Sequence, residues 1–227
     1  MWLVVVAWCA LASGFGSAGY IVWDILGRGY RQPMRVMEAV WPITALYFLP
    51  LAVWAYHRFG RPKTEKWLRR HQREEPPAQP NWAAVATGVS HCGAGCTLGD
   101  IIAEFVIFGL GATIAGEALF AMYVGDYLAA VGLGIVFQYL AIAPMRGLGL
   151  GEGLKEAAKA DVLSLTAFEV GLFGWMALMR FVFFPDSPLE PSSPAYWFLM
   201  QIGMAIGFFT AWPANVWLIR RGIKEAM

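Results

Sequence analysis

The amino-acid sequence predicts an all-α, polytopic membrane protein with about six transmembrane helices, the third of them interrupted. Apolar residues make up 58% of the 227-residue chain and charged residues only 15%, which is too apolar for an ordinary soluble domain. Several stretches also reach the roughly 20 apolar residues that an α-helix needs to cross a bilayer. The lipid bilayer is therefore the first expected partner of this chain.

Charge and cysteine content argue against other classes of protein. The 17 basic and 16 acidic side chains leave no excess of positive charge for nucleic-acid binding. Three cysteines, two of them in one short segment, do not make a disulfide framework. The first apolar run has no basic residue before it and is too long for the core of a signal peptide. We therefore expect it to be a retained membrane helix.

Residues 1–57 predict an N-terminal transmembrane hairpin. We expect a first helix over about Trp2–Leu26 and a second over about Ala39–Tyr56, kinked at Pro50 because proline removes a helical hydrogen bond. Residues 58–81 then predict a linker, which is basic at first and rich in proline at its end. The positive-inside rule places this linker in the cytoplasm.

Residues 82–227 predict a four-helix membrane domain. Its first apolar stretch covers residues 82–116, and further helices are expected over about Glu117–Ala143, Asp161–Phe184 and Tyr196–Ile219. The loop over residues 144–160 and the C-terminal tail are basic, as is the linker. We therefore predict six membrane crossings with both termini in the cytoplasm. In that arrangement the three arginines of the first loop lie outside.

The segment His91–Asp100, with the sequence HCGAGCTLGD, concentrates reactive side chains in an apolar region. On a helix Cys92 and Cys96 share a face, whereas His91 lies about 100° from the first thiol and about 140° from the second at 3.6 residues per turn. The three side chains can converge only if the helix is broken. We expect the break at the two glycines between the cysteines, where the backbone unwinds most easily.

The length of the same stretch also predicts an interruption. Its 35 residues, 82–116, would form a helix about 52 Å long, against about 30 Å of hydrocarbon in a bilayer. With a break between His91 and Thr97, the imidazole and the thiols of Cys92 and Cys96 form a donor set suited to a transition-metal ion, copper or zinc. Redox chemistry of the two thiols is one alternative. Helix packing by small residues around buried thiols is another.

Carboxylates inside the apolar stretches are candidates for charge balance or a proton relay. A charge at mid-membrane costs about 2.5–3.5 kcal/mol, so such residues usually face a cavity or a partner. Mutual hydrogen bonding, or pairing with Arg180, is the structural alternative. In the last helix Pro213 frees the carbonyl of Phe209, which with Asn215 is a candidate oxygen ligand. The carboxylates are Asp100, Glu104, Asp126 and Glu169.

The run His91–Asp100 resembles an uncharacterised prokaryotic membrane family, domain of unknown function forty-three ninety-six. Two later stretches, 153–175 and 213–225, resemble the same family, so that the resemblance covers most of the chain after Trp82. It implies a multi-pass protein of a prokaryotic inner (plasma) membrane. It implies no activity and assigns no catalytic residue.

Three functions are compatible with these features. The first is a transport protein that moves or hands over a copper or zinc ion bound by His91, Cys92 and Cys96. The second is a membrane thiol oxidoreductase that uses the two cysteines with a quinone or another protein. The third is a non-catalytic subunit, either a homo-oligomer or a part of a larger membrane complex, favoured by the many small and aromatic residues.

Overall fold

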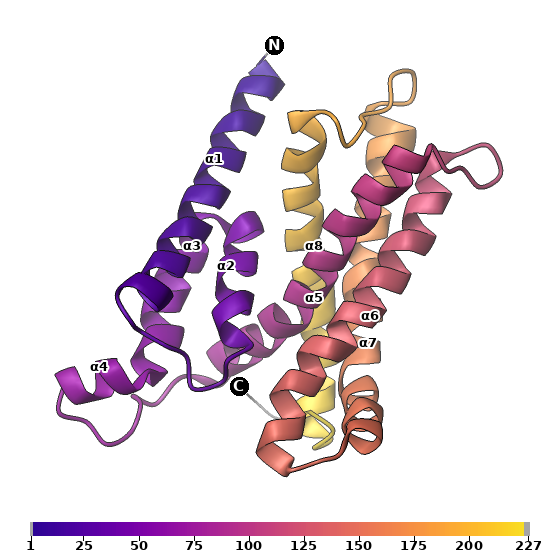
Figure 1. Cartoon of the computed structure of the whole chain (residues 1–227). Coiled ribbons are helices and arrows are strands. Elements are labelled where there is room, and N and C mark those ends of the chain that lie inside the picture. The colour runs from indigo at the N-terminus through magenta and orange to yellow at the C-terminus, as the bar shows by residue number, and fades with distance from the viewer. Residues whose placement is uncertain (1, 225–227) are drawn as a thin grey trace.

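The structure, a computed structural model, confirms the all-α fold class (Figure 1). It describes residues 2–224, and of residues 142–146 the backbone alone. Turns of π-helix lengthen α1 to Gly27, α3 to Gly60 and α7 to Phe183. Within the described residues the α-helices are α1 (Trp2–Val22), α2 (Met37–Phe48), α3 (Pro50–Ala55), α4 (Glu65–Arg70), α5 (Asn81–Leu110), α6 (Ala118–Arg146), α7 (Leu150–Leu178) and α8 (Pro194–Arg220).

Five of these helices, α1 and α5 to α8, are long and apolar enough to cross a membrane. They leave large apolar side chains exposed on the outside of the protein, among them Trp2 at 75% and Leu110 at 73%. An apolar outer surface is stable in hydrocarbon and not in water. The chain is therefore a polytopic α-helical membrane protein.

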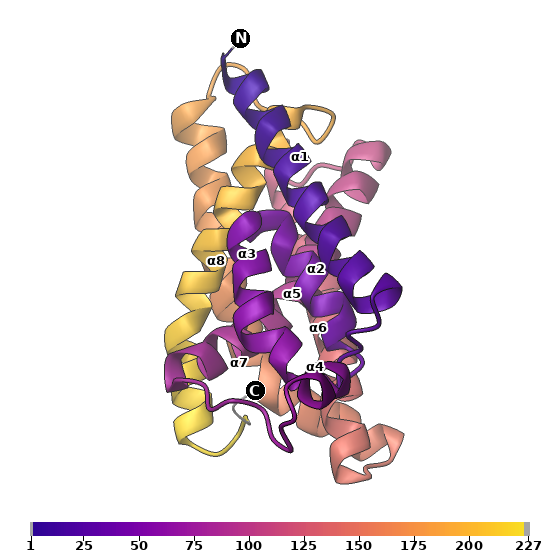
Figure 2. The same cartoon turned by 90° about the vertical axis from the view of Figure 1, so that its left-hand side faces the viewer.

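The helices α5 to α8 form an antiparallel bundle, α1 to α3 lie along one side of it, and α4 projects away from it (Figures 1 and 2). The loop that we expected over residues 144–160 is wrong except at residues 147–149, because α6 continues to Arg146 and α7 begins at Leu150. The charged residues there lie on the exposed side of the helix, where Lys159 and Glu156 form an ion pair at 2.8 Å. Charges spaced three or four apart on one face favour a helix as well as a loop.

The expected interruption of the motif helix is wrong. Helix α5 is continuous from Asn81 to Leu110 and ends at Gly111, whose φ of 60° forms a left-handed cap. Its 30 residues make it about 45 Å long, and it fits a bilayer by inclining strongly against α8 (Figure 1). The two glycines that were expected to unwind are helical. Length alone therefore did not require a break.

The glycines of α5 serve close packing instead. A Cβ atom on Gly95 would lie 2.7 Å from the Cα atom of Gly134 in α6, and one on Gly99 would lie 2.6 Å from the backbone nitrogen of Ala130. The two helix backbones thus touch, as small residues permit in membranes. Unwinding would also leave backbone groups without hydrogen bonds in an apolar interior, which costs several kcal/mol per group.

The interrupted helix is the second one, and the chain reverses there. Leu49 separates α2 from α3 with φ 55° and ψ −137°, just before Pro50. The ring of Trp41 in α2 lies 5.8 Å from the ring of Tyr56 and in contact with Gly60. In a continuous helix residues 41 and 60 would be about 28 Å apart. Residues 37–60 therefore form a re-entrant hairpin, which appears in Figure 2 as an arch that turns at mid-height.

Neighbouring helices support the tip of the re-entrant hairpin. Gln201 of α8 donates a hydrogen bond from Nε2 to the carbonyl of Leu46 at 2.7 Å. Gly14, in the middle of α1, brings its backbone against the same carbonyl. The break at Leu49 leaves carbonyls without helical partners, and irregular backbone is stable at membrane depth only where protein groups satisfy it. The hairpin thus enters the protein to mid-depth and returns.

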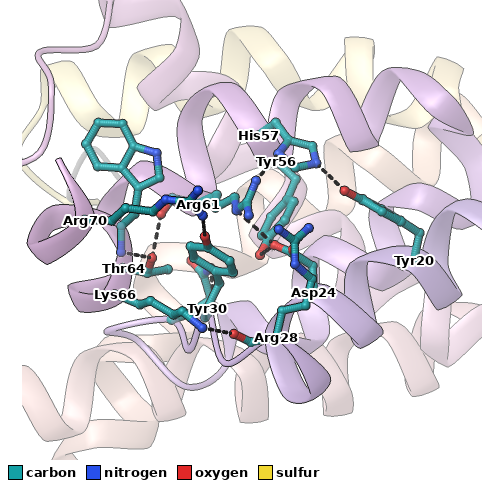
Figure 3. A network of polar contacts seen from close by, with 12 residues as sticks. Tyr20, Asp24, Arg28, Tyr30, Tyr56, His57, Arg61, Thr64, Lys66 and Arg70 are labelled. Carbon is teal, nitrogen blue, oxygen red and sulfur yellow. Dashed lines mark hydrogen bonds and ion pairs between the residues drawn. The ribbon is translucent and has the colours of Figure 1, made fainter.

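A network around Asp24 holds the returning end of the hairpin to the end of α1 (Figure 3). The carboxylate of Asp24 is fully buried and forms ion pairs with Arg28 at 3.0 Å and Arg61 at 3.2 Å. It also accepts a hydrogen bond from the Tyr56 hydroxyl at 2.9 Å. The guanidinium of Arg61 stacks over the ring of Tyr30, 3.8 Å from its centroid. These contacts fix the returning end of the re-entrant hairpin to the end of α1.

The structure differs from the prediction of six crossings: among the described residues five helices are long and apolar enough to cross a membrane, and the expected second crossing is the re-entrant hairpin. Helix α1 begins and α8 ends at opposite ends of the protein (Figure 1), and the cytoplasmic location of the termini stays a prediction. All of the 17 lysines and arginines except Arg180 belong to segments 28–73, 146–159 and 220–224. These segments share one end, which we call the basic end. The first loop, whose three arginines were expected outside, therefore lies at the basic end with the other basic segments.

This path of the chain gives a direct test of topology. We expect single cysteines placed at the exposed Pro33 and at Pro77, in a Cys9→Ser background, to be labelled by an impermeant maleimide from the same side of the membrane. A cysteine at Pro188 should be labelled from the other side. Labelling of Pro33 and Pro77 from opposite sides would restore the continuous second helix and exclude the re-entrant hairpin.

Candidate functional site

Four polar side chains follow one face of α5 inside the bundle. Cys92, Cys96, Asp100 and Glu104 recur at every fourth residue, and each has no exposed surface. This spacing keeps them on one stripe of the helix, about 18 Å long from the first to the last. The expectation that Cys92, Cys96 and Asp100 share a face thus agrees with the continuous helix, without any break.

Neighbouring helices add two carboxyl groups to this stripe. Asp126 of α6 interacts electrostatically with Glu104, and Glu169 of α7 interacts with Cys96. Asp100 lies between them and interacts with both of these carboxyl groups. Residues from three helices are therefore brought together. We call the set the thiol–carboxylate row: Cys92, Cys96, Asp100, Glu104, Asp126 and Glu169.

The carboxyl groups of the row have no compensating cation among the described residues. None of the four forms an ion pair with a described residue, and the side chains that Glu104 and Glu169 do approach, which are Tyr196, Asp126 and Cys96, carry no positive charge. Arg180, the alternative partner considered from the sequence, instead pairs with Glu117 through two hydrogen bonds of 2.9 and 3.0 Å. Four anions would be strongly unstable in such a place. The row is therefore suited to hold protons or a cation.

Residues around the row come from segments to which the sequence assigned no role. The Tyr47 ring from the tip of the re-entrant hairpin is buried beside Gly93 and interacts electrostatically with both thiols. Tyr196 of α8 is buried close to Glu104. The one signal that could have indicated Tyr47 and Tyr196 is that each is a buried tyrosine near a helix end. The sequence does not reveal which side chains are buried.

His91 faces a different part of the interior. Its ring is fully buried, 6.4 Å from the ring of Phe137 in α6, and neither ring nitrogen has a hydrogen-bond partner. It interacts electrostatically with Asp161 and Lys224. Because α5 is continuous, His91 remains separated around the helix from the thiols of Cys92 and Cys96, as the sequence predicted for an unbroken helix. The described residues contain no group of three His, Cys, Asp or Glu side chains already arranged to hold a metal ion.

A buried ion pair lies towards the basic end of the bundle. The ammonium of Lys224 donates to Asp161 at 3.0 Å, and both side chains have no exposed surface. Gly222, with φ 67°, turns the chain after α8 so that Lys224 can reach inwards. The sequence analysis treated residues 220–224 only as a basic tail. The turn that brings Lys224 back into the bundle interior depends on tertiary packing. It leaves no periodic pattern in the sequence from which it could be predicted.

The two candidate oxygen ligands of α8 differ in position. Asn215 is buried, donates from Nδ2 to Ser164 at 2.5 Å and to the Ala211 carbonyl at 2.9 Å, and leaves its Oδ1 atom unpaired. Phe209 is 63% exposed, and its ring packs on Phe48 outside the bundle interior. Of the two, Asn215 alone has its side chain in the interior.

Comparison with known proteins gives a family and no activity. A family model described as Domain of unknown function (DUF4396) matches residues 81–224, which is the bundle from α5 to the turn after α8. Neither the curated proteins nor the solved structures contain a match. The matched region exceeds half of the chain and contains the whole thiol–carboxylate row. The chain therefore belongs to the DUF4396 family.

Proposed function

We propose that this protein is a membrane transport protein that binds a soft transition-metal ion, copper or zinc, inside the α5–α8 bundle and moves it or hands it over. One observation carries the proposal: the thiols of Cys92 and Cys96 lie among buried carboxyl groups that have no cation partner among the described residues. Thiol sulfur selects copper and zinc over magnesium and calcium.

The proton balance of binding follows from these groups. A thiol must lose its proton to become a metal ligand, so each thiolate–metal bond releases one proton. Glu169 interacts with Cys96 and Asp100 interacts with Glu169, which gives two neighbouring oxygen acceptors. Release of the metal would return the protons to sulfur. The carboxyl groups of the row thus supply either charge for the cation or a place for the displaced protons.

His91 has a different role in this proposal from the one expected on the sequence. On the continuous α5 the imidazole stays about 100° and 140° around the helix from the two thiols, and it interacts with the ion pair of Asp161 and Lys224, whose ammonium also interacts with both thiols. The first ligand set is therefore Cys92, Cys96 and the carboxyl group of Glu169. His91 and Asn215 continue the polar interior towards the basic end, where a transported ion would leave the row.

The distribution of charge supports an orientation. We propose that the basic end faces the cytoplasm of a prokaryotic cell, because lysine and arginine accumulate on the cytoplasmic side of inner-membrane proteins. The start of α1 and Arg180 would then lie outside. The short helix α4, with Arg69 and Arg70 in its last turn, would rest at the anionic inner surface of the bilayer.

A thiol oxidoreductase fits the geometry less well. On a continuous helix, Cβ atoms at positions i and i+4 are about 5–6 Å apart, whereas a disulfide requires about 3.5–4.5 Å. Cys92 and Cys96 could form a disulfide only with distortion of α5 where it packs against α6. A non-catalytic subunit would not need buried, unpaired carboxyl groups, which are costly in a membrane.

Metal content after loading tests the proposal. We expect the purified protein, loaded with Cu(I) or Zn(II) and washed, to retain metal by elemental analysis, about one equivalent of which is bound by Cys92 and Cys96. The Cys92→Ser/Cys96→Ser variant should lose that equivalent, because a hydroxyl is a poor ligand for these ions. Cys9→Ser is the matched control, since Cys9 is exposed on α1. Equal metal in the double variant and the wild type would reject the proposed function.

A further inference from the structure

A cavity opens at the end of the bundle opposite the basic end. Its volume is about 280 Å³, and α6, α7, α8 and the loop after α7 form its walls. Three methionines line it, and all are more than nine-tenths buried: Met122, Met176 and Met179. The Tyr196 hydroxyl, also in the wall, donates to the sulfur of Met122 at 4.0 Å. Two helices thus contribute methionine side chains to the wall of one cavity.

The cavity continues the thiol–carboxylate row. Met122 precedes Asp126 by four residues and Met176 follows Glu169 by seven, so each methionine shares a helix face with a carboxyl group of the row. Tyr196 lies in the wall of the cavity and interacts with Glu104 and Asp126. Tyr196 therefore connects the wall of the cavity with the row.

Charges at the rim of the cavity leave it slightly acidic. Glu117 and Arg180 neutralise one another in their ion pair, and Glu190 adds a further carboxyl group. A cation arriving from that side would meet no unpaired positive group among the lining residues, and then three neutral sulfur donors. Thioether sulfur is a ligand for Cu(I), whereas zinc is bound through thiolate, imidazole and carboxylate.

We infer that this cavity is a loading site for Cu(I), in which Met122, Met176 and Met179 bind the ion before it enters the thiol–carboxylate row. The inference rests on the proposed function and narrows its substrate to copper in the reduced state. Neutral thioethers leave the bound ion with a single positive charge, which the carboxyl groups beyond Tyr196 attract. Transfer to Cys92 and Cys96 exchanges thioether bonds for thiolate bonds, with two protons released and no change in oxidation state.

The alternative is that these methionines only fill space, since methionine adapts to irregular gaps in apolar cores. Leucine serves that purpose equally well, and exchange of methionine for leucine is usually tolerated because it conserves volume. It removes the sulfur without opening a large gap. The triple variant Met122→Leu/Met176→Leu/Met179→Leu therefore separates ligation from packing.

The experiment is a titration of purified protein with Ag(I), as a redox-inert substitute for Cu(I), and with Zn(II). We expect two Ag(I) equivalents on the wild type, one on the triple methionine variant, and one on Cys92→Ser/Cys96→Ser. Zn(II) binding should be the same in the wild type and the methionine variant. Met37→Leu, on α2 in a different buried cluster, is the matched control and should keep both Ag(I) equivalents.

The outcomes separate the two proposals. An unchanged Ag(I) count in the methionine variant overturns the loading site, whatever the cysteine variant does. An unchanged count in the cysteine variant overturns the proposed thiol site, whatever the methionine variant does. Because the triple variant could fold poorly, the single variants Met122→Leu and Met176→Leu are titrated as well. Each should weaken the outer equivalent at least tenfold, and an unchanged affinity in both would also count against the loading site.

Discussion

Replacing Asp24 by alanine is expected to destabilise the protein by about 3–5 kcal/mol, the usual cost of leaving buried charges without their partner. The carboxylate of Asp24 is fully buried, and its removal leaves the buried side of Arg61 and the Tyr56 hydroxyl unpaired. The returning end of the re-entrant hairpin would lose its main connection to α1. Equilibrium unfolding in detergent micelles, followed by helical circular dichroism, measures the change.

Glu38→Ala is the control for Asp24→Ala. Glu38 pairs with Arg31, which is 48% exposed, and exposed ion pairs contribute about 0–1 kcal/mol. Both variants remove one carboxylate at the basic end, so a difference between them reports burial and not net charge. Similar stabilities for the two variants would show that the network in Figure 3 does not hold the hairpin in place.

Substitution of Gly99 by alanine is expected to destabilise the bundle by about 1–3 kcal/mol, as overpacking of a close-packed interior does. The added Cβ atom would lie 2.6 Å from the backbone nitrogen of Ala130 and 2.8 Å from the carbonyl carbon of Ala129. Backbone atoms cannot rotate away as a side chain can. The helices α5 and α6 must therefore separate, and Asp100 would move away from Asp126.

Gly109→Ala on the same helix should have the opposite sign. A Cβ atom there meets nothing within 4 Å, and alanine favours a helix over glycine by about 0.5–1 kcal/mol. The pair of variants therefore separates helix propensity from helix packing, again by unfolding in micelles. If Gly99→Ala stabilised the protein as Gly109→Ala does, α5 and α6 would not be in the close contact described above.

The sequence by itself was sufficient for the fold class and for most of the helices. Runs of about 20 apolar residues can satisfy their backbone groups in lipid only as helices, so composition and length predict α1, α6 and α8 within a few residues. The spacing of Cys92, Cys96 and Asp100 placed them on one helix face, because this depends on helical geometry alone. The motif was also specific enough to indicate the family.

Tertiary structure decided where the chain breaks and which side chains meet. The two glycines in α5 and the proline at residue 50 are both local features that predict a break in a helix. Contact with α6 kept α5 helical, whereas Gln201 could stabilise a reversal at Leu49. The convergence of Asp126 and Glu169 on the face of α5 that carries Cys96 and Asp100 depends on how the helices of the bundle pack. Packing joins residues far apart in the chain, and the period of a single helix contains no information about its neighbours.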